Sequence, residues 1–222
     1  MKKRIDGRTA KGLRIRQRVR ESILTAYIDL IRSGVPAPIA REIAERARLS
    51  PRVIFKHFSD LRALRLASFN RMQAQSSEFF SEEIPDRGSA AERLELFVQK
   101  HMRRLEYVAP IHRTAAMVER VDPDVAKAMK VARNAAVRDL AKTLGSALKP
   151  FSRSEKRALL TTLHMVCSWP SWETLRTHYH LSPRRARAII TSVALTVLAA
   201  AERRVRAHLT RRQFRPPGKT QS

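Results

Sequence analysis

The chain has 222 residues, of which 43% are hydrophobic and only 6 are Gly, so it is long enough to bury a core and is neither a low-complexity nor a disordered polymer. Its 45 Lys and Arg against 20 Asp and Glu give a formal net charge of +25, which favours a polyanionic partner, nucleic acid first. The single cysteine, Cys167, excludes an internal disulfide and a cysteine-rich zinc site, as is typical of a reducing compartment.

The basic start of the chain has no apolar stretch behind it, so we do not expect a secretory signal. The longest apolar run, residues 188–201, is shorter than the roughly 20 residues that cross a bilayer as a helix. The sequence therefore predicts a cytoplasmic protein without a membrane partner.

Apolar residues recur at every third or fourth position along most of the chain, as at Ile23, Tyr27 and Leu30, and no segment alternates convincingly. Prolines separate the periodic stretches. This pattern predicts an all-α protein of about nine helices. The expected helices span residues 16–32, 39–47, 51–57, 60–83, 89–108, 111–120, 123–148, 154–179 and 183–208.

The first short helices are too small to enclose a large ligand site, but they are sufficient for a helical DNA-reading unit. We therefore expect a DNA-binding domain over residues 16–62 and a separate helical bundle over residues 63–208. Residues 1–15 and 209–222 carry basic residues and turn formers without periodicity, which predicts a flexible basic arm and tail.

Two short helices joined by a tight turn are expected between residues 39 and 64. Ser50 and Pro51 supply an N-cap followed by a proline at the first helical position. Ile54 and Phe58, four positions apart, should face inward and leave basic and amphipathic residues facing out. This layout is typical of a helix-turn-helix, whose second helix enters the major groove.

Several motifs in this segment carry a family resemblance. They are Ile43-Ala44-Glu45-Arg46-Ala47, then Ser50, then Phe55-Lys56-His57-Phe58, then Asp60 and Leu64. In these motifs the chain resembles the TetR family of bacterial transcriptional regulators, most strongly over residues 16–70. The resemblance implies a three-helix DNA-binding domain followed by an effector-binding and dimerisation bundle. It also implies a one-component regulator, more often a repressor, that binds a palindromic operator as a homodimer and is released by a small-molecule effector.

The sequence departs from the family pattern at the turn and in the second helix. Arg48 stands where a turn Gly is usual, and a left-handed conformation there costs about 1–2 kcal/mol. Val53, Phe55 and Leu61 replace a common Thr, Tyr and Lys, which removes possible phosphate contacts. Residues 1–20 carry 9 Lys and Arg against 1 acid, so we expect diffuse charge to recover affinity along the backbone or in the minor groove.

Arg52 and Lys56 are the expected base-edge contacts, although either could be a solvated surface charge. His57 is expected to bond a phosphate rather than only cap its helix, and Phe55 either contacts a thymine methyl or sugar or packs half in the core. The residues expected to contact DNA are Ser50, Pro51, Arg52, Val53, Phe55, Lys56, His57, Arg16 and Arg18.

Apolar and polar residues of the bundle offer candidates for an effector pocket, although most Met and aromatic residues at helical spacing are simply core. The candidates are His101, Met102, Leu105, His112, Met117, His164, Met165, Trp169 and Trp172. Because the histidines lack a metal-ligand spacing, we expect no metal and no cofactor.

The apolar run before the C-terminus is too hydrophobic for a solvent-facing helix, and Pro170 should break or kink the helix before it. Together these helices resemble the homodimer interface of the TetR family, which implies a dimer contact here. The residues expected there are Leu163, Val166, Ile189, Val193, Val197 and Leu198.

A basic architectural or RNA-binding protein without an effector is the alternative function. Residues 1–65 carry 17 Lys and Arg against 6 acids, and the rest carries 28 against 14, so the excess is not confined to the DNA-binding domain. An enzyme is not expected, because the sequence has no nucleotide-binding Gly loop, no metal-spaced carboxylates and no nucleophile elbow.

Overall fold

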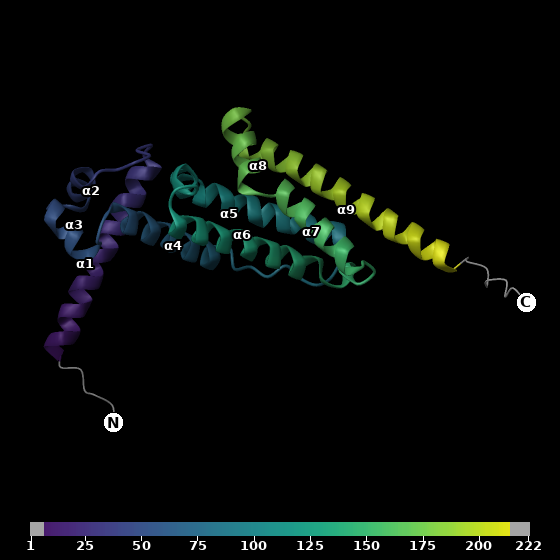
Figure 1. Cartoon of the computed structure of the whole chain (residues 1–222), viewed down its shortest axis with the longest axis horizontal. Coiled ribbons are helices and arrows are strands. Elements are labelled where there is room, and N and C mark those ends of the chain that lie inside the picture. Colours follow the sequence, from purple (N-terminus) through teal and green to yellow (C-terminus); the bar gives the residue numbers. More distant parts are fainter. Residues whose placement is uncertain (1–6, 214–222) are drawn as a thin grey trace, which may run out of the picture. The chain divides into compact units, whose positions relative to one another are not determined.

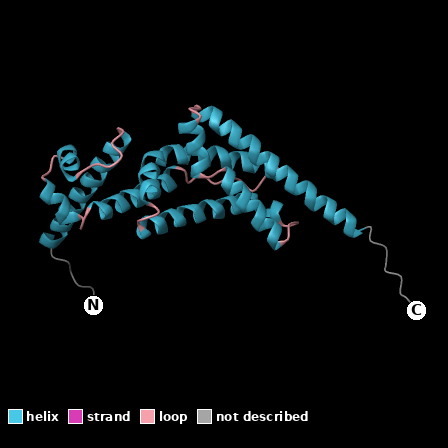
Figure 2. Cartoon of the chain, turned by 45° about the horizontal axis from the view of Figure 1, so that its top comes forward, coloured by secondary structure: helices cyan, strands magenta, loops and turns pink. Residues whose placement is uncertain are grey.

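The structure is a computed structural model that describes residues 7–213, with side chains from residue 11 to residue 207. Within that range all regular secondary structure is helical and no strand occurs (Figures 1 and 2), which confirms the all-α prediction. The elements are α1 (Gly7–Arg32), α2 (Ala40–Ala47), α3 (Pro51–His57), α4 (Leu61–Phe79), α5 (Ala90–Val118), α6 (Pro123–Leu144), a 3-10 turn (Gly145–Leu148), α7 (Arg153–Val166), α8 (Trp169–Glu173), a π-helical turn (Thr174–His178) and α9 (Pro183–Gln213).

The chain forms two compact units, and α5 and α6 contribute residues to both. Unit 1 contains described residues 7–79 together with Tyr107–Val131, and unit 2 contains Phe80–Glu106 together with residues 132–213. Within unit 1, α4 packs against α1. The division of labour between a DNA-binding and an effector-binding domain remains a prediction.

The helices α1 to α4 build the helix-turn-helix part of unit 1 (Figure 1). In it α1 packs against α2 and α4, and α2 packs against α3. Each helix supplies one aliphatic side chain that is fully inaccessible: Ile23, Ile43, Ile54 and Leu64. The inward face of the second short helix was predicted from its spacing, and the burial of Ile54 and Phe58 confirms it.

Polar contacts add to the apolar packing between α1 and α4. The Arg71 guanidinium donates to the Glu21 carbonyl at 3.1 Å and to the Thr25 hydroxyl at 3.0 Å. Its Nη1 also lies 3.4 Å from the Glu21 carboxylate. These contacts fix α4 at the back of the helix-turn-helix.

The ends of the described chain differ from the expected flexible arm and tail. The first helix begins at Gly7 and the last continues to Gln213, so residues 7–15 and 209–213 are helical. Residues 11–18 are exposed, so burial does not account for the extension of the helix there. The rest of the predicted arm and tail lies outside the described residues.

The expected break at Pro110 is wrong. One continuous helix, α5, replaces the predicted helices 89–108 and 111–120. Proline costs a helix one backbone hydrogen bond and a steric clash. Here Ala109 and Ile111 on either side of it are both buried, so packing of the apolar face outweighs the local signal.

The turn between α2 and α3 keeps a left-handed residue although Arg48 stands where a Gly is usual. Arg48 adopts φ 56° and ψ 44°, the left-handed region, and its N–H bonds the carbonyls of Ala44 and Glu45. The Leu49 N–H also donates to the Ala44 carbonyl at 2.9 Å. The tight turn is therefore made at a position where a side chain is unfavourable.

Replacing Arg48 by Gly is expected to stabilise the protein by roughly 0.5–1 kcal/mol, because relief of left-handed strain exceeds the entropy cost of Gly. Urea unfolding measures the change. The matched control is Arg46→Gly, which removes the same charge from the last turn of α2 and should destabilise by roughly 1 kcal/mol. A loss of stability in both variants would contradict the assignment of strain to Arg48.

Unit 2 contains α7, α8 and α9, and α7 packs against α9. The predicted helix 154–179 is interrupted at Cys167, and Ser168 caps a new short helix that has Pro170 in its first turn. The break predicted from Pro170 is therefore confirmed. At the start of α7, Ser152 accepts the Glu155 N–H at 3.3 Å while the Glu155 carboxylate accepts the Ser152 N–H at 2.8 Å.

Candidate nucleic-acid interface

The outer face of α3 is exposed and cationic. Arg52 and Lys56 are both open to solvent, and Phe55 between them keeps 49% of its surface exposed. On the opposite face Ile54 and Phe58 are buried. Two turns of helix therefore present two cations and one aromatic ring outward, held by an apolar inner face.

The start of α3 has the expected residues in the expected places. Ser50 has extended backbone angles at the N-cap position, and Pro51 follows in the first turn. The Ser50 hydroxyl makes no capping bond to the helix, although the Val53 N–H donates to the Ser50 carbonyl at 2.9 Å. Ser50 itself is exposed at this turn.

His57 closes the other end of the helix and is half-buried. Partial burial lowers the pKa of its imidazole, and the positive charges of Arg16 and Arg20 lower that pKa further. The ring is therefore held neutral at neutral pH, a form in which one ring nitrogen still donates a hydrogen bond.

Arg16 and Arg18 lie on the exposed part of α1. They share this stretch with Lys11 and Arg14, which are also exposed. Arg20, next in this basic series, differs because it is half-buried and its guanidinium donates to the His57 carbonyl at 3.0 Å.

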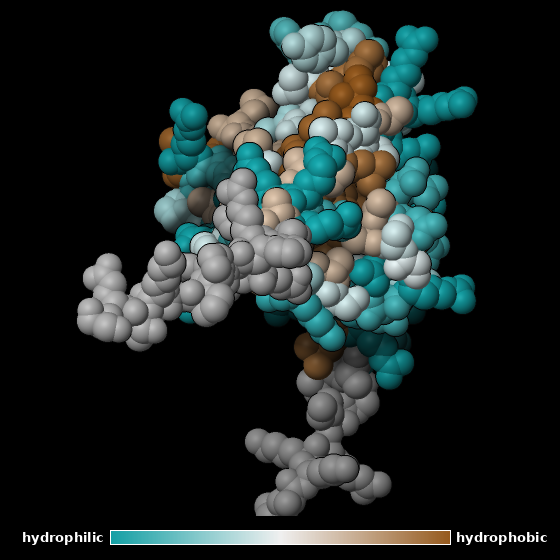
Figure 3. Space-filling view, turned by 90° about the vertical axis from the view of Figure 1, so that its right-hand side faces the viewer, coloured by the Kyte–Doolittle hydropathy of each residue, from teal (hydrophilic) through white to brown (hydrophobic). Residues whose placement is uncertain are grey.

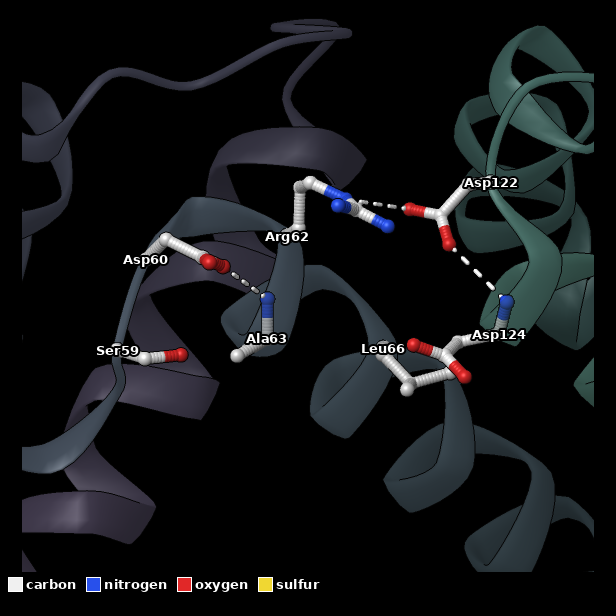
Figure 4. A pocket seen from close by; sticks show the side chains of 7 residues that line it. All are labelled: Ser59, Asp60, Arg62, Ala63, Leu66, Asp122 and Asp124. Atoms are coloured by element: carbon white, nitrogen blue, oxygen red, sulfur yellow. Dashed lines mark hydrogen bonds and ion pairs between the residues drawn. The ribbon is translucent and has the colours of Figure 1, made fainter.

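A small polar cavity lies in unit 1 beside the start of α4 (Figure 4). Its volume is about 190 Å³, and it is lined by Ser59, Asp60, Arg62, Ala63, Leu66, Asp122 and Asp124. Asp60 caps α4 by accepting the Ala63 N–H at 2.7 Å. The buried Asp122 carboxylate accepts Nε of Arg62 at 3.0 Å and the Val125 N–H at 3.3 Å. One carboxylate thus joins the first turns of α4 and α6.

The hydrogen bond from Arg62 lowers the pKa of Asp122, and the N–H groups of Val125 and Asp124 act in the same direction. A carboxyl whose pKa is lower in the folded state contributes stability above its unfolded pKa, and this contribution disappears as the pH falls through the folded pKa. Asp122→Asn should therefore destabilise the protein at neutral pH, and the difference from wild type should shrink below about pH 4.

Urea unfolding of both proteins between neutral and acidic pH measures this difference. The exposed Asp124→Asn, in the same cavity, is the matched control and should show a smaller effect at neutral pH. A destabilisation by Asp122→Asn that is constant across the pH range would show that the Asp122 charge is not its source.

Known structures share this architecture. A TetR-family transcriptional regulator from Streptomyces coelicolor superposes with a TM-score of 0.65 at 15% identity, covering 85% of this chain and 91% of that one. A structure from Rhodococcus sp. assigned to the same family gives a TM-score of 0.63 at 18% identity, over 82% and 99% of the two chains. The chain has a TetR-type fold. No protein-family model matches the sequence, and no curated protein does.

Within this TetR-type fold the residues predicted to form an effector pocket do not share one environment. His112 and Met117 belong to unit 1, and the other seven belong to unit 2. Met102 and Leu105 are buried and His101 stacks on Phe97 with ring centroids 5.2 Å apart, as core residues do. Met117 and Met165 are exposed, His164 and Trp169 are half-buried, and Trp172 is buried.

The buried Trp172 takes part in a polar network with Glu106 and Arg176. Its indole N–H donates to the Glu106 carboxylate at 3.0 Å. The same carboxylate accepts two bonds from Arg176, at 3.1 and 2.8 Å, and Arg176 also donates to the Leu181 carbonyl. This network fixes the π-helical turn and the connection to α9 against α5.

The residues predicted for the dimer interface differ in exposure, and their role in a dimer stays a prediction. Leu163 and Leu198 are covered within the chain, because α7 and α9 pack on each other. Ile189 and Val193 remain 44% and 43% exposed, and Val166 and Val197 are half-buried. In the face that Figure 3 presents, apolar side chains are visible among hydrophilic ones.

Within the described part of the chain, no group of three His, Cys, Asp or Glu side chains could hold a metal ion. None of the described helices has the length and apolar character needed to span a membrane. Cys167 is buried, which raises the pKa of its thiol to about 12 and keeps the reactive thiolate scarce at neutral pH.

Sequence reasoning missed two contacts that position α3 and α4. The sequence indicates part of the ion pair between Asp122 and Arg62, because an Asp directly before a proline such as Pro123 is a common helix start. It does not indicate that Arg62 is the partner. The role of Arg20 could not be read from the sequence, because its hydrogen-bond partner is a backbone carbonyl far along the chain and Arg16 and Arg18 precede it in the same helix.

Proposed function

We propose that the protein is a transcriptional regulator that binds duplex DNA through α3. The exposed pair Arg52 and Lys56 on a helix anchored by Ile54 is the observation that carries this proposal. A helix of this kind fits the major groove, where each base pair presents a distinct pattern of donors and acceptors. The TetR-type fold supports the same function.

Within this proposal the side chains divide into base-reading and backbone-contacting sets. Arg52 and Lys56 would bond base edges, and the exposed ring of Phe55 would contact a thymine methyl group. Ser50 and the neutral His57 would donate to phosphates at the two ends of the helix. The remaining contacts, by Pro51 and Val53 at the base edges and by Arg16 and Arg18 at phosphates, would complete the interface.

The proposed active form is a homodimer. One short helix reads too few base pairs for useful specificity, whereas a two-fold dimer places two such helices about 34 Å apart on successive turns of the major groove. Ile189 and Val193 are the candidate contacts, because large aliphatic side chains left exposed on one helix favour burial against a second copy. The half-buried Val166 and Val197 would extend that surface.

We further propose repression that is relieved by a small-molecule effector bound in the bundle. The effector would favour a separation of the two DNA-binding units that does not fit the operator. Shifting the protein from mostly bound to mostly free requires a preference of a few kcal/mol for one state, up to about 5.5 kcal/mol for a nearly complete switch. No chemical change of a side chain is needed.

Footprinting on DNA that contains the protein's own promoter region tests the function. One protected palindromic site is expected, with protection in two half-sites one helical turn apart. Protection that grows with protein concentration along the whole duplex, without a site, would instead support the alternative of a basic architectural or RNA-binding protein, which the excess charge outside residues 1–65 favours.

A further inference from the structure

Arg20 joins α1 to the C-terminal end of α3 through two contacts. Its Nη1 donates to the His57 carbonyl at 3.0 Å. Its guanidinium carbon lies 4.1 Å from the centroid of the Phe58 ring, over the ring face. The side chain is half-buried, whereas Arg16 and Arg18 earlier in the same helix are exposed.

One of the two groups that Arg20 contacts, the His57 carbonyl, is of the kind that the end of a helix leaves without a partner. The last four carbonyls of a helix have no intrahelical donor. In α3 the Phe58 N–H bonds the Ile54 carbonyl at 2.9 Å, and the guanidinium bonds the His57 carbonyl. A cation at a helix C-terminus is also favoured by the helix dipole. Arg20 therefore caps α3 from a different helix.

The contact with the Phe58 ring restricts the position of the Arg20 guanidinium. Phe58 is 4% exposed, so its ring is fixed in the core. A guanidinium stacked on a fixed ring is restricted in position as well as attracted. Because the backbone of α3 packs chiefly on α2, Arg20 adds a second support, from α1, at the end opposite Pro51.

We propose that Arg20 is a positioning residue that sets the orientation of α3, and through it the sequence discrimination of Arg52 and Lys56. This inference rests on the proposed function. Side chains that read base edges must be held within roughly 0.5 Å and 10–20° of their productive geometry. A helix of only seven residues depends on contacts with its neighbours to hold its side chains to that tolerance.

Arg20→Met removes the charge and the donors while keeping an unbranched side chain over the Phe58 ring. With a duplex selected by the wild-type protein and a scrambled duplex as probes, the ratio of the two affinities is expected to fall by about tenfold or more in the variant. Its affinity for the scrambled duplex and its salt dependence should stay close to wild type. Arg20→Lys, which retains one donor and the cation, should recover part of the ratio.

Arg18→Met is the matched control, since it removes an exposed arginine of the same helix. It is expected to weaken binding to both duplexes equally and to reduce the slope of log affinity against log salt by about 0.9 for each phosphate that is no longer neutralised. If Arg20→Met behaved as Arg18→Met does, Arg20 would be a phosphate-binding residue and the proposal would be wrong. An unchanged affinity ratio in folded Arg20→Met protein would also overturn it.

Hydrogen exchange of the free protein tests the proposal without DNA. In Arg20→Met the Phe58 amide, which bonds the Ile54 carbonyl, should exchange about tenfold faster as the end of α3 opens. The Leu49 amide at the end of α2 should be unchanged. Equal exchange at Phe58 in both proteins would reject the cap. If the wild-type protein itself did not discriminate between duplexes while Phe58 exchanged faster in the variant, the proposed function alone would be rejected.

Discussion

The double variant Arg52→Ala, Lys56→Ala is expected to remain folded and to lose about 100-fold or more in preference for its operator over unrelated duplex DNA. Each good base-edge contact discriminates by roughly 1–3 kcal/mol, and a dimer makes each contact twice. Both side chains are exposed on α3 and make no contribution to the buried face formed by Ile54 and Phe58, so their removal should not unfold the protein. Fluorescence anisotropy with specific and scrambled duplexes at one salt concentration measures the preference.

Loss of two positive charges by itself weakens any DNA complex, so the comparison needs a variant of equal charge. Arg14→Ala, Arg18→Ala removes two exposed arginines from α1. It should lower affinity for both duplexes alike and leave their ratio close to wild type. Identical behaviour of the two double variants would show that α3 does not read bases.

Affinity for any duplex is expected to fall by about 10³–10⁵ between 50 and 200 mM salt, the range for proteins that make 6–10 phosphate contacts. The exposed cations of α1 and the cations of the residues before it are the proposed source. Deleting residues 1–10 removes Lys2, Lys3, Arg4 and Arg8 and leaves the buried face of α1, beginning near Ile23, intact. The truncated protein should bind all sequences more weakly and show a shallower salt dependence.

Arginines of unit 2 provide the contrast for this prediction. Arg184→Gln, Arg185→Gln changes two exposed residues at the start of α9. If the proposed interface is in unit 1, the salt slope of this variant should equal that of wild type. If each lost charge reduced the salt slope of this variant as much as in the truncated protein, diffuse binding over the whole basic surface would be favoured.

The helix-turn-helix could be predicted in detail from the sequence because its signals are local. Ser50 and Pro51 mark a helix start, and the spacing of Ile54 and Phe58 defines its buried face. Each of these features depends on residues within a few positions of one another. The exposure of Arg52 and Lys56 follows from the same spacing.

Other features depend on packing between distant segments and could not be predicted. Helical periodicity shows that the run containing Ile189 and Leu198 is apolar, but not which residues α7 covers. Pro110 signals a break that buried neighbours override. The role of Arg20 depends on a carbonyl 37 positions away, and nothing in its own surroundings distinguishes it from Arg18.

Selection of bound sequences from a pool of random duplexes is the most direct test of α3 as a DNA-reading helix in a two-fold dimer. We expect enrichment of one palindrome whose half-sites are centred about 10 base pairs, or a multiple of this, apart. We further expect that the Arg52→Ala, Lys56→Ala variant enriches no motif from the same pool. A pool that stays random after repeated selection by the wild-type protein, or a motif enriched equally by the double variant, would contradict the assignment of α3 as the reading helix.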